Sequence, residues 1–416
     1  MANVSSSNGL EKRPKLRFPG FDEPWKTNIF DEIFSLLPNN TLSRADLASY
    51  GAVLNVHYGD VLIKYGSILD VESDEIPYIA AGKESKKQCY LSDGDVIIAD
   101  TAEDKTVGKC AEITNTKNAK IEAGLHTIPC HPRTAYAPMF LGYYMNSPYY
   151  HKQLIPLMQG VKVLSVSKSN IGNTLISAPT SYSEQEKIVE LLHLLDCRMR
   201  KQQEVIDNLK KYKRGVICKV FSEIEHENNM IRFGDCVSIF RGGSPRPIDD
   251  YITDDPSGIN WIKIGDTSED ELYITRTKEK IISAGAKKSR RVYQGDLILS
   301  NSMSFGRPYI LQIAGCIHDG WLLIRDEKNI FDKRFLCYYL GSDNVIAQYK
   351  RFAAGSCVNN LNSELVGNVK ICCPPRAVQQ KIADMLTILD LRIDHAIHTC
   401  EAFQRMRTSL LQQLFM

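Results

Sequence analysis

The sequence predicts an α+β fold in which two strand-rich domains are each followed by a long helix, and the two helices pair as an antiparallel coiled coil. Three observations predict this fold. "FLGYYMNS" from Phe140 recurs as "FLCYYLGS" from Phe335, which indicates a duplicated unit. Short apolar runs such as "DVIIA" and "DLILS" are bounded by Gly, Asp and Ser, as strands are. Each unit ends in a long stretch without proline whose apolar residues repeat every 3.5 positions.

The composition is that of a soluble globular protein. Hydrophobic residues make up 43% and charged residues 24% of the chain. The formal net charge of +2 favours no particular partner. The N-terminus lacks the apolar core of a signal peptide, and no run is long enough to cross a bilayer. We therefore expect a cytoplasmic protein without membrane contact, whose twelve cysteines are reduced.

The order of the repeated motifs gives the domain boundaries. "GDVIIA" at Gly94 matches "GDLILS" at Gly295, and prolines at Pro179 and Pro374 close the strand-rich parts. The offsets between matched motifs differ, which indicates loops of different length in the two copies. We expect a disordered or flexible N-terminus over 1–19, a first strand-rich domain over 20–180, a central helix over 181–224, a second strand-rich domain over 225–375 and a C-terminal helix over 376–416.

The two long helices carry matching heptads. Ten positions from Ile188 to Val220, in steps of four and three, hold eight apolar residues; the equivalent positions of the second helix hold nine. This period is typical of a coiled-coil seam. A pseudo-two-fold relation between the units would make the helices antiparallel, with a strand-rich domain at each end. The predicted seam comprises Ile188, Leu192, Leu195, Met199, Ile206, Leu209, Ile382, Leu386, Leu389, Ile393, Phe403 and Leu410.

Catalytic motifs are sparse. The chain contains neither a G-x-x-x-x-G-K-[ST] phosphate loop nor a G-x-G-x-x-G followed by an acidic residue. Asp95, Glu103 and Lys105 match the D…E-x-K pattern of metal-dependent nucleases, which leaves a magnesium-dependent nuclease as one alternative. The second copy keeps the Gly-Asp but lacks the Glu and the Lys, so a turn before a strand explains the pattern more simply. We predict no catalytic residue and no metal ligand.

Basic loops occur in both strand-rich domains. Their Lys and Arg side chains can neutralise phosphates, and Arg and Ser can reach base edges. The candidate DNA-binding residues are Lys83, Lys86, Lys87, Lys162, Arg241, Arg246, Lys287, Lys288, Arg290, Arg291, Ser304 and Arg307.

With these motifs in this order, the sequence resembles the specificity (S) subunits of type I restriction–modification systems over nearly its whole length. "LRFPGF", "INWIKIGD", "YQGDLILSNSMSFGRPYI", "CIHDGWLLIR" and "GSCVNNLNSELVGNVKI" carry the resemblance, together with the helix openings "EQEKIVELLHLLDCR" and "VQQKIADMLTILDLR". The first copy departs from the pattern, because "ADTAEDKTVGK" replaces the Ser- and Arg-rich segment that the family often shows after Gly-Asp.

The resemblance implies a non-catalytic subunit whose two target-recognition domains bind double-stranded DNA with a bipartite target. It implies two methyltransferase (M) subunits as partners and, in complexes that also cleave, two restriction (R) subunits. It implies no cofactor in this chain, since S-adenosylmethionine belongs to the M subunit and ATP and magnesium to the R subunit. It places subunit contacts on outward helix residues, for which the candidates are Glu186, Glu190, Arg198, Gln380, Asp384 and Arg392. The alternative is a coiled-coil scaffold or interaction protein without DNA specificity.

Overall fold

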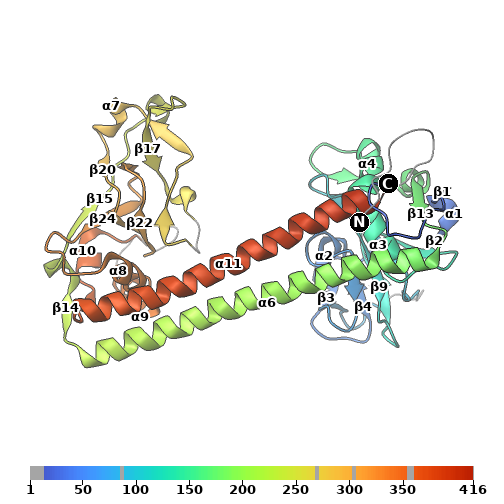
Figure 1. Ribbon diagram of the computed structural model, residues 1–416, viewed down its shortest axis with the longest axis horizontal. Helices are drawn as coiled ribbons and strands as arrows, with labels where there is room; N and C mark the ends of the chain where they lie inside the picture. Colours follow the sequence, from blue (N-terminus) through green and yellow to red (C-terminus); the bar gives the residue numbers. More distant parts are fainter. Residues whose placement is uncertain (1–13, 85–88, 268–270, 302–305, 354–359, 416) are drawn as a thin grey trace. The chain divides into compact units, whose positions relative to one another are not determined.

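The computed structural model describes residues 14–84, 89–267, 271–301, 306–353 and 360–415 (Figure 1). The chain divides into two compact units. Unit 1 comprises residues 1–203 and 399–416, and unit 2 comprises residues 204–398. The long helices α6 (Tyr182–Glu227) and α11 (Arg376–Leu414) each contribute one segment to either unit. None of the helices within these described ranges is both long and apolar enough to cross a membrane.

Unit 1 begins with its strand-rich part. Its strands are β1 (Lys26–Ile29), β2 (Phe34–Leu36), β3 (Leu47–Ala48), β4 (Leu54–Val56), β5 (Ile68–Asp70), β6 (Tyr78–Ile79), β7 (Val96–Ala99), β8 (Thr101–Ala102), β9 (Cys110–Thr114), β10 (Ile121–Ala123), β11 (Thr127–Pro132), β12 (Leu164–Ser165) and β13 (Leu175–Ala178). Its shorter helices are α1 (Phe30–Ile33), α2 (Tyr58–Ile63), α3 (Phe140–Met145), α4 (Pro148–Leu154) and α5 (Lys168–Gly172), with 3-10 turns η1 (Arg44–Asp46) and η2 (Ile155–Leu157).

Unit 2 repeats this plan after the segment of α6 that it contains. Its strands are β14 (Met230–Arg232), β15 (Ser238–Arg241), β16 (Ile252–Thr253), β17 (Ile259–Ile262), β18 (Tyr273–Ile274), β19 (Glu279–Ile281), β20 (Arg290–Val292), β21 (Leu297–Ser300), β22 (Pro308–Leu311), β23 (Gly315–Ile317), β24 (Trp321–Arg325) and β25 (Lys370–Cys372). Its shorter helices are α7 (Ser283–Ala286), α8 (Lys333–Leu340), α9 (Asp343–Ala353) and α10 (Ser363–Gly367), with 3-10 turns η3 (Phe233–Asp235), η4 (Ile248–Asp250) and η5 (Ile264–Asp266).

One five-stranded sheet has the same topology in both units, and we call it the shared sheet. Its strand order is β2-β11-β7-β9-β5 in unit 1 and β15-β24-β21-β22-β18 in unit 2. In both, the last strand pairs in parallel and the other neighbours pair antiparallel. Identical order and direction over five strands indicate that a whole domain was duplicated.

The run "DVIIA" is continuously apolar because β7 is buried on both faces. Val96 and Ile98 pack toward α3 and the long helices, while Ile97 and Ala99 pack against the second sheet of the unit. Alternate side chains of a strand point to opposite faces, so a central strand between two cores needs apolar residues throughout.

The second sheet differs between the units. It has four strands in the order β10-β4-β6-β3 in unit 1, and five in the order β16-β19-β17-β23-β20 in unit 2. The unequal offsets of the sequence repeat therefore have a structural cause, which is a different sheet beside the shared one.

The Gly-Asp motif is a turn that leads into the shared sheet in both units. Gly94 has φ +86° and Gly295 has φ +85°, in the left-handed region that favours glycine. The next residue fastens the turn, because Asp95 accepts the Ser92 N–H (2.8 Å) and Asp296 accepts the Tyr293 N–H (2.9 Å).

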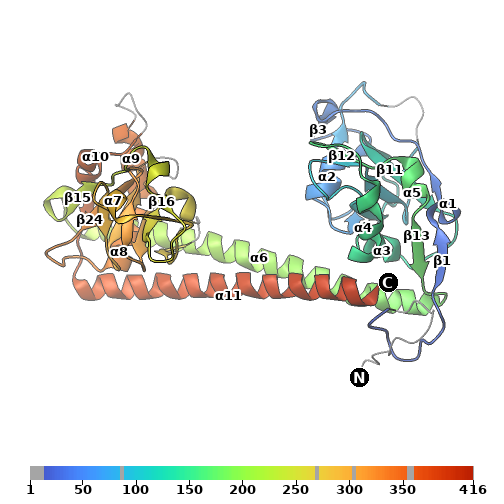
Figure 2. The same cartoon turned by 90° about the horizontal axis from the view of Figure 1, so that it is seen from above.

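The two long helices run antiparallel within each unit (Figure 1, Figure 2). In unit 1, Ile188 and Leu192 near the start of α6 share a core with Leu411 and Leu414 near the end of α11. In unit 2, Phe221 near the end of α6 shares a core with residues of the first turns of α11. The predicted fold class, two strand-rich parts each followed by a long helix with the two helices paired, is confirmed. The proposed seam residues are buried or half-buried: Ile188, Leu192, Leu195, Met199, Ile206, Leu209, Ile382, Leu386, Leu389, Ile393, Phe403 and Leu410.

The described portion of the N-terminal segment is attached to unit 1. The Leu16 N–H donates to the Gln413 oxygen (2.9 Å), and the Arg17 Nε donates to the buried Glu184 carboxylate (2.7 Å). Residues 14–19, which we expected to belong to a disordered or flexible N-terminus over 1–19, are therefore held against unit 1. Residues 1–13 lie outside the described residues. At the other boundary, α6 ends at Glu227 rather than at 224.

A buried carboxylate from the shared sheet caps α3 in unit 1. Glu112 on β9 accepts the N–H groups of Met139 (2.5 Å) and Gly142 (2.8 Å). Met139 has φ +73°, in the left-handed region that residues other than glycine rarely adopt. Burial raises the pKa of Glu112 to about 7, more than these two hydrogen bonds lower it.

Replacing Glu112 by Gln should flatten the pH dependence of stability in unit 1. The carboxyl titrates near 4.5 when unfolded and near 7 when folded, so its protonated form stabilises the native state below pH 4.5. This contribution is lost as the pH rises through 7. Urea unfolding at pH 5 and pH 8 should show the wild type losing on the order of 2–3 kcal/mol more than E112Q over that interval. The exposed Glu103→Gln is the control, and equal losses in wild type and E112Q would contradict the prediction.

Candidate nucleic-acid interface

Unit 2 brings six of the predicted basic residues together on two neighbouring segments. The Ser289 Oγ donates to the Gly243 oxygen (2.6 Å), and the Arg290 Nε donates to the Arg241 oxygen (3.1 Å). These bonds fasten the loop after β15 against the start of β20. We call the six exposed residues the basic edge: Arg241, Arg246, Lys287, Lys288, Arg290 and Arg291.

A glycine allows the loop of the basic edge to cross the sheet. A Cβ on Gly242 would lie 2.1 Å from the His318 backbone oxygen, so a larger residue would displace the loop. The Gly242 N–H donates to the Trp321 oxygen (2.8 Å), which joins this loop to β24 of the shared sheet. Cations carried by β15 and by the second sheet are thereby held side by side.

Aromatic rings lie beneath two of these cations. The Arg290 guanidinium is 5.2 Å from the Phe240 ring centroid, and the Lys288 Nζ is 5.0 Å from that of Tyr251. The Lys288 Nζ also donates to the Tyr251 hydroxyl (2.6 Å). Such contacts hold long side chains in one orientation without neutralising their charge. Phe240 and Tyr251 were not among the residues predicted from the sequence, although Phe240 directly precedes Arg241 in "FRGG".

A polar cluster borders the basic edge. Asp319 accepts from the Ser244 Oγ (2.9 Å), the His318 Nε2 (2.9 Å) and the Arg246 Nη2 (3.4 Å). Although burial raises the pKa of Asp319, these partners hold it below its usual range. The His318 Nδ1 accepts the Gly320 N–H (2.9 Å), so its proton is on Nε2 and points to Asp319. His318 therefore cannot act as a base toward Ser244, and the cluster orders the loop rather than forming a nucleophile.

The basic edge adjoins a cavity of about 940 Å³ in unit 2. Ser244, Arg246 and His318 line it on one side, and the buried Trp261 lies at its wall. A recess with an aromatic wall and a few polar groups next to a basic surface is suited to a base edge or a sugar.

The other predicted DNA-binding residues do not join the basic edge. Lys83 forms an ion pair with Asp46 (3.2 Å), and Lys162 is exposed in a loop of the same unit with no described contact to Lys83. Arg307 lines a separate cavity of about 470 Å³, beside the long helices of unit 2. Lys86, Lys87 and Ser304 lie outside the described residues.

The positions of Asp95, Glu103 and Lys105 argue against the nuclease alternative. Asp95 is 1% exposed, and its second carboxylate oxygen lies 2.6 Å from the His131 Nδ1. Burial raises the pKa of Asp95. Glu103 and Lys105 are exposed, so the carboxylates do not share a site. Across the described ranges, no group of three or more His, Cys, Asp or Glu residues could hold a metal ion.

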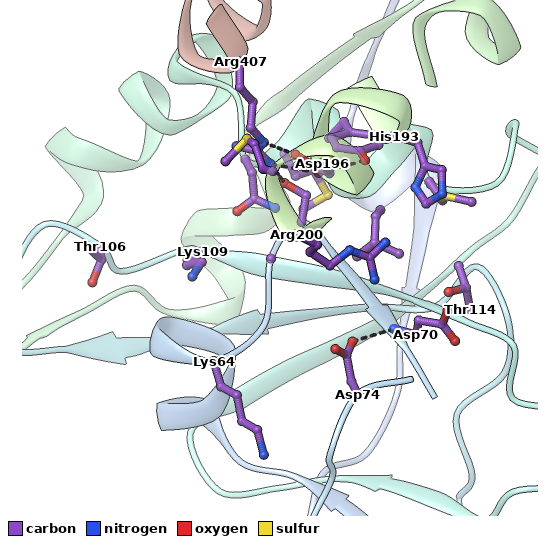
Figure 3. A pocket seen from close by; sticks show the side chains of 18 of the residues that line it. Lys64, Asp70, Asp74, Thr106, Lys109, Thr114, His193, Asp196, Arg200 and Arg407 are labelled. Carbon is purple, nitrogen blue, oxygen red and sulfur yellow. Dashed lines mark hydrogen bonds and ion pairs between the residues drawn. The ribbon is translucent and has the colours of Figure 1, made fainter. Parts of the chain in front are cut away.

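A Tyr–Asp–cation triad joins each strand-rich part to the paired helices. In unit 1, the Tyr143 hydroxyl on α3 donates to Asp196 on α6 (2.9 Å). Arg407 on α11 donates from Nε to the same carboxylate (2.5 Å) and from Nη2 to the Ser67 Oγ (2.9 Å). Figure 3 shows Arg407 and Asp196 meeting above a cavity of about 680 Å³, which Lys109 and Arg200 also line.

Unit 2 contains the equivalent triad with acid and cation exchanged between the helices. The Tyr338 hydroxyl on α8 donates to Asp390 on α11 (2.5 Å), and Lys213 on α6 forms an ion pair with Asp390. Acid and cation change helices because the two helices are copies of one repeat that pair antiparallel, so the acid of each copy meets the cation of the other. The triads had no role among the sequence predictions, although Tyr143 recurs as Tyr338, Asp196 as Asp390 and Lys213 as Arg407 at the offset of the repeat.

A buried glutamine makes a second attachment in each unit. The Gln185 side chain accepts the Ala137 N–H and donates to the Pro179 oxygen, both at 2.9 Å. The Gln379 side chain accepts the Asp332 N–H (2.7 Å) and donates to the Pro374 oxygen (2.9 Å). Ala137 and Asp332 stand just before α3 and α8, so each glutamine fixes the start of the helix that carries the triad tyrosine.

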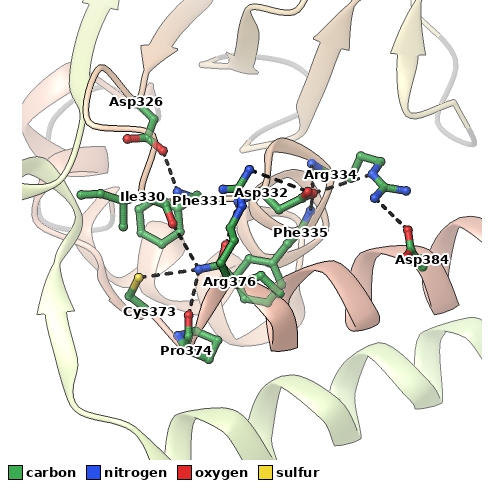
Figure 4. Close-up of polar contacts among 11 residues, drawn as sticks. Asp326, Ile330, Phe331, Asp332, Arg334, Phe335, Cys373, Pro374, Arg376 and Asp384 are labelled. Atoms are coloured by element: carbon green, nitrogen blue, oxygen red, sulfur yellow. Dashed lines mark hydrogen bonds and ion pairs between the residues drawn. The ribbon is translucent and has the colours of Figure 1, made fainter.

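The outward helix residues proposed for subunit contacts lie at the surface. Glu186, Glu190, Arg198, Gln380 and Arg392 are exposed. Asp384 is exposed too, but it also forms an ion pair with Arg334 of α8 (2.8 Å; Figure 4). Exposed apolar side chains accompany them at equivalent positions, namely Leu194 (58% exposed) and Ile388 (53% exposed).

A segment in the second half of the chain matches a known family. Residues 225–399 match the family model of the type I restriction modification DNA specificity domain. The fold is similar to that of the S subunit of a type I restriction–modification system from M. genitalium, at 14% identity and a TM-score of 0.55, covering 97% of this chain and 99% of that chain. It is also similar to a chain from a study of complex assembly and conformational transition of the type I R-M system, at 18% identity and a TM-score of 0.63, covering 97% of this chain and 99% of that chain.

Replacing Arg290 by Ala should weaken binding to duplex DNA several-fold at low salt. Each lost phosphate contact also lowers the slope of log affinity against log salt by about 0.9. Fluorescence anisotropy of a labelled duplex, between about 50 and 200 mM salt, measures both quantities. Lys328→Ala is the matched control, because Lys328 is exposed and lies beyond the end of β24 that is remote from the basic edge. An unchanged slope in R290A would remove Arg290 from the interface.

Proposed function

We propose that this chain, a type I restriction–modification specificity (S) subunit by its matched domain and its fold, reads a bipartite DNA target for a complex with two M subunits. Unit 1 reads one half of the target and unit 2 reads the other, while the paired helices set the separation. In this proposal the protein works in the cytoplasm, where the chromosomal DNA is.

One observation carries the proposal. The shared sheet is the same in both units, whereas the second sheet beside it differs in strand number and order. A protein that holds two recognition surfaces in equivalent positions but reads a different sequence with each needs this combination of a constant frame and a variable surface.

The basic edge supplies the DNA contacts of unit 2. Lys and Arg side chains neutralise phosphates and fix the register, and Arg can also read guanine in the major groove. The proposal includes Lys83 and Lys162 in unit 1, Arg307 in unit 2, and Lys86, Lys87 and Ser304, which lie outside the described residues. The phosphate contacts provide affinity, and the loops of the second sheets provide sequence discrimination.

The chemistry belongs to the partner subunits in this proposal. The M subunits bind S-adenosylmethionine and methylate adenine N6, after the target base leaves the stack. Where R subunits are present, they use ATP and magnesium to cut DNA. This chain performs no catalytic step, which is consistent with the structural role of Asp95 in its turn.

The helices carry the proposed surface for the M subunits. It comprises the outward residues Glu186, Glu190, Arg198, Gln380, Asp384 and Arg392, with Leu194 and Ile388 between them. The positions are equivalent in the two repeats, so the same partner surface can dock twice. Exposed apolar residues rimmed by charges are typical of protein–protein contacts.

Co-expression with the M subunit tests the proposal. Methylome sequencing should detect adenine methylation at one bipartite motif only when this chain is present. Exchanging residues 20–180 for those of a relative should change one half of the motif and leave the other unchanged. Methylation without this chain, or two unchanged halves after the exchange, would refute the proposal. The purified chain should not cut DNA in the presence of magnesium.

A further inference from the structure

We propose that the two triads, Tyr143–Asp196–Arg407 and Tyr338–Asp390–Lys213, are positioning residues that determine which spacer length the complex accepts between the two half-sites. Each triad fixes the tilt of its own strand-rich part on the paired helices. The inference rests on the proposed function, and it assigns to side chains remote from the basic edge a role in choosing the target.

Each triad joins three segments that are far apart in the sequence. In unit 1 these are α3, α6 and α11, and in unit 2 they are α8, α11 and α6. The carboxylate stands in the middle and holds both other partners. A movement of the strand-rich part against the helices must therefore break a charge-assisted hydrogen bond, which is stronger than a neutral one. Apolar packing, in contrast, is not directional.

The triads are partly shielded from solvent. The Asp196 and Asp390 side chains are 23% and 20% exposed, and the hydroxyl-bearing Tyr143 and Tyr338 are buried. The cations also lie over the tyrosine rings, with Arg407 6.0 Å and Lys213 5.4 Å from the ring centroids. Partial burial weakens competition from water and keeps these contacts specific.

Together with the buried glutamines, the triads attach each strand-rich part at a pair of points on one face of a long helix. Gln185 precedes Asp196 by 11 residues (185 to 196), and Gln379 precedes Asp390 by 11 (379 to 390). Eleven residues are about three turns of 3.6, so both side chains lie on the same face, roughly 16 Å apart. One attachment would permit rotation about itself, whereas two fix the angle.

A small change in this angle is enough to alter the spacer. The far surface of a domain of about 150 residues lies on the order of 30 Å from its base. A tilt of roughly 7° moves that surface by about 3.4 Å, which is one base-pair step of DNA. Losing the triad while keeping the glutamine and the shared apolar core loosens the tilt without detaching the strand-rich part.

The two copies also indicate which substitution the geometry tolerates. The cation is Arg407 in unit 1 and Lys213 in unit 2, in the same place against an equivalent Tyr–Asp pair. A Lys213→Arg variant should therefore keep the positioning, whereas Lys213→Met should not. Tyr212→Phe is a matched control, because Tyr212 is an exposed tyrosine next to Lys213 on the same helix.

The experiment compares methylation of three duplexes by the complex of the full chain with its M subunit. The duplexes carry the same half-sites, with the native spacer or a spacer one base pair shorter or longer. For Tyr338→Phe and Lys213→Met we expect methylation at the altered spacers to rise about tenfold relative to the native spacer. The rate at the native spacer should stay within about twofold, and K213R and Y212F should keep wild-type selectivity.

Selectivity is compared only among variants whose melting temperature stays near that of the wild type. Since Lys213→Met leaves the Tyr338 hydroxyl bond in place, it serves if Tyr338→Phe does not fold. Unchanged spacer selectivity in these variants, or relaxed selectivity in Y212F, would overturn the inference. That result would leave the proposed function intact, because the proposed function is tested by the dependence of wild-type methylation on this chain and by the exchange of residues 20–180.

Discussion

The fold depends on the antiparallel register of α6 and α11, which two partly buried ion pairs mark. Asp196 faces Arg407 and Lys213 faces Asp390. Lys213 follows Asp196 by 17 residues (196 to 213), and Asp390 precedes Arg407 by 17 (390 to 407), so both pairs obey one alignment of the helices. A slip by one heptad would leave four charges without partners in partly buried positions, at a cost of several kcal/mol. The apolar seam alone, which looks similar at every heptad, does not distinguish these registers.

Above this frame, the two units combine a constant layer with a variable one. The shared sheet packs its inner face on α3 or α8 and on the long helices, so its residues are constrained from both sides. The second sheet packs with one face on the outer face of the shared sheet, and in unit 2 its other face packs on Ile248, Tyr251 and Ala286. Its loops are free to differ. The basic edge forms where the two layers meet, because Arg241 extends from a shared strand and Arg290 from a variable one. The position of the basic edge is therefore fixed by the shared sheet, while the side chains that it presents vary with the second sheet.

The sequence was sufficient to predict the fold class, because the two copies of the repeat can be compared with each other. Long heptads, repeated Gly-Asp strand entries and matching "FLGYYM" and "FLCYYL" segments all survive in the linear order. The resemblance to type I specificity subunits is confirmed over residues 225–399 by the family match, and the fold is similar to that of an S subunit. The candidate nucleic-acid interface was harder to predict from the sequence. Arg307 and Arg290 look alike in the sequence, yet only Arg290 joins the basic edge, since strand pairing decides which loops become neighbours. Phe240, Tyr251 and Gln379 owe their roles to partners distant in the chain, which no local pattern reveals.

The different caps of α3 and α8 determine where a segment of this chain can be exchanged without loss of a helix cap. In unit 2, the helix supplies its own cap, because Asp332 directly before α8 accepts the N–H groups of Arg334 and Phe335. In unit 1 the equivalent residue is Ala137, and the cap comes from Glu112, on a strand 27 residues before Met139. Genetic recombination with a joint between β9 and α3 would separate the helix from its cap, whereas a joint between β22 and α8 would not. The sites at which unit 1 can be recombined are thus restricted by a single buried carboxylate.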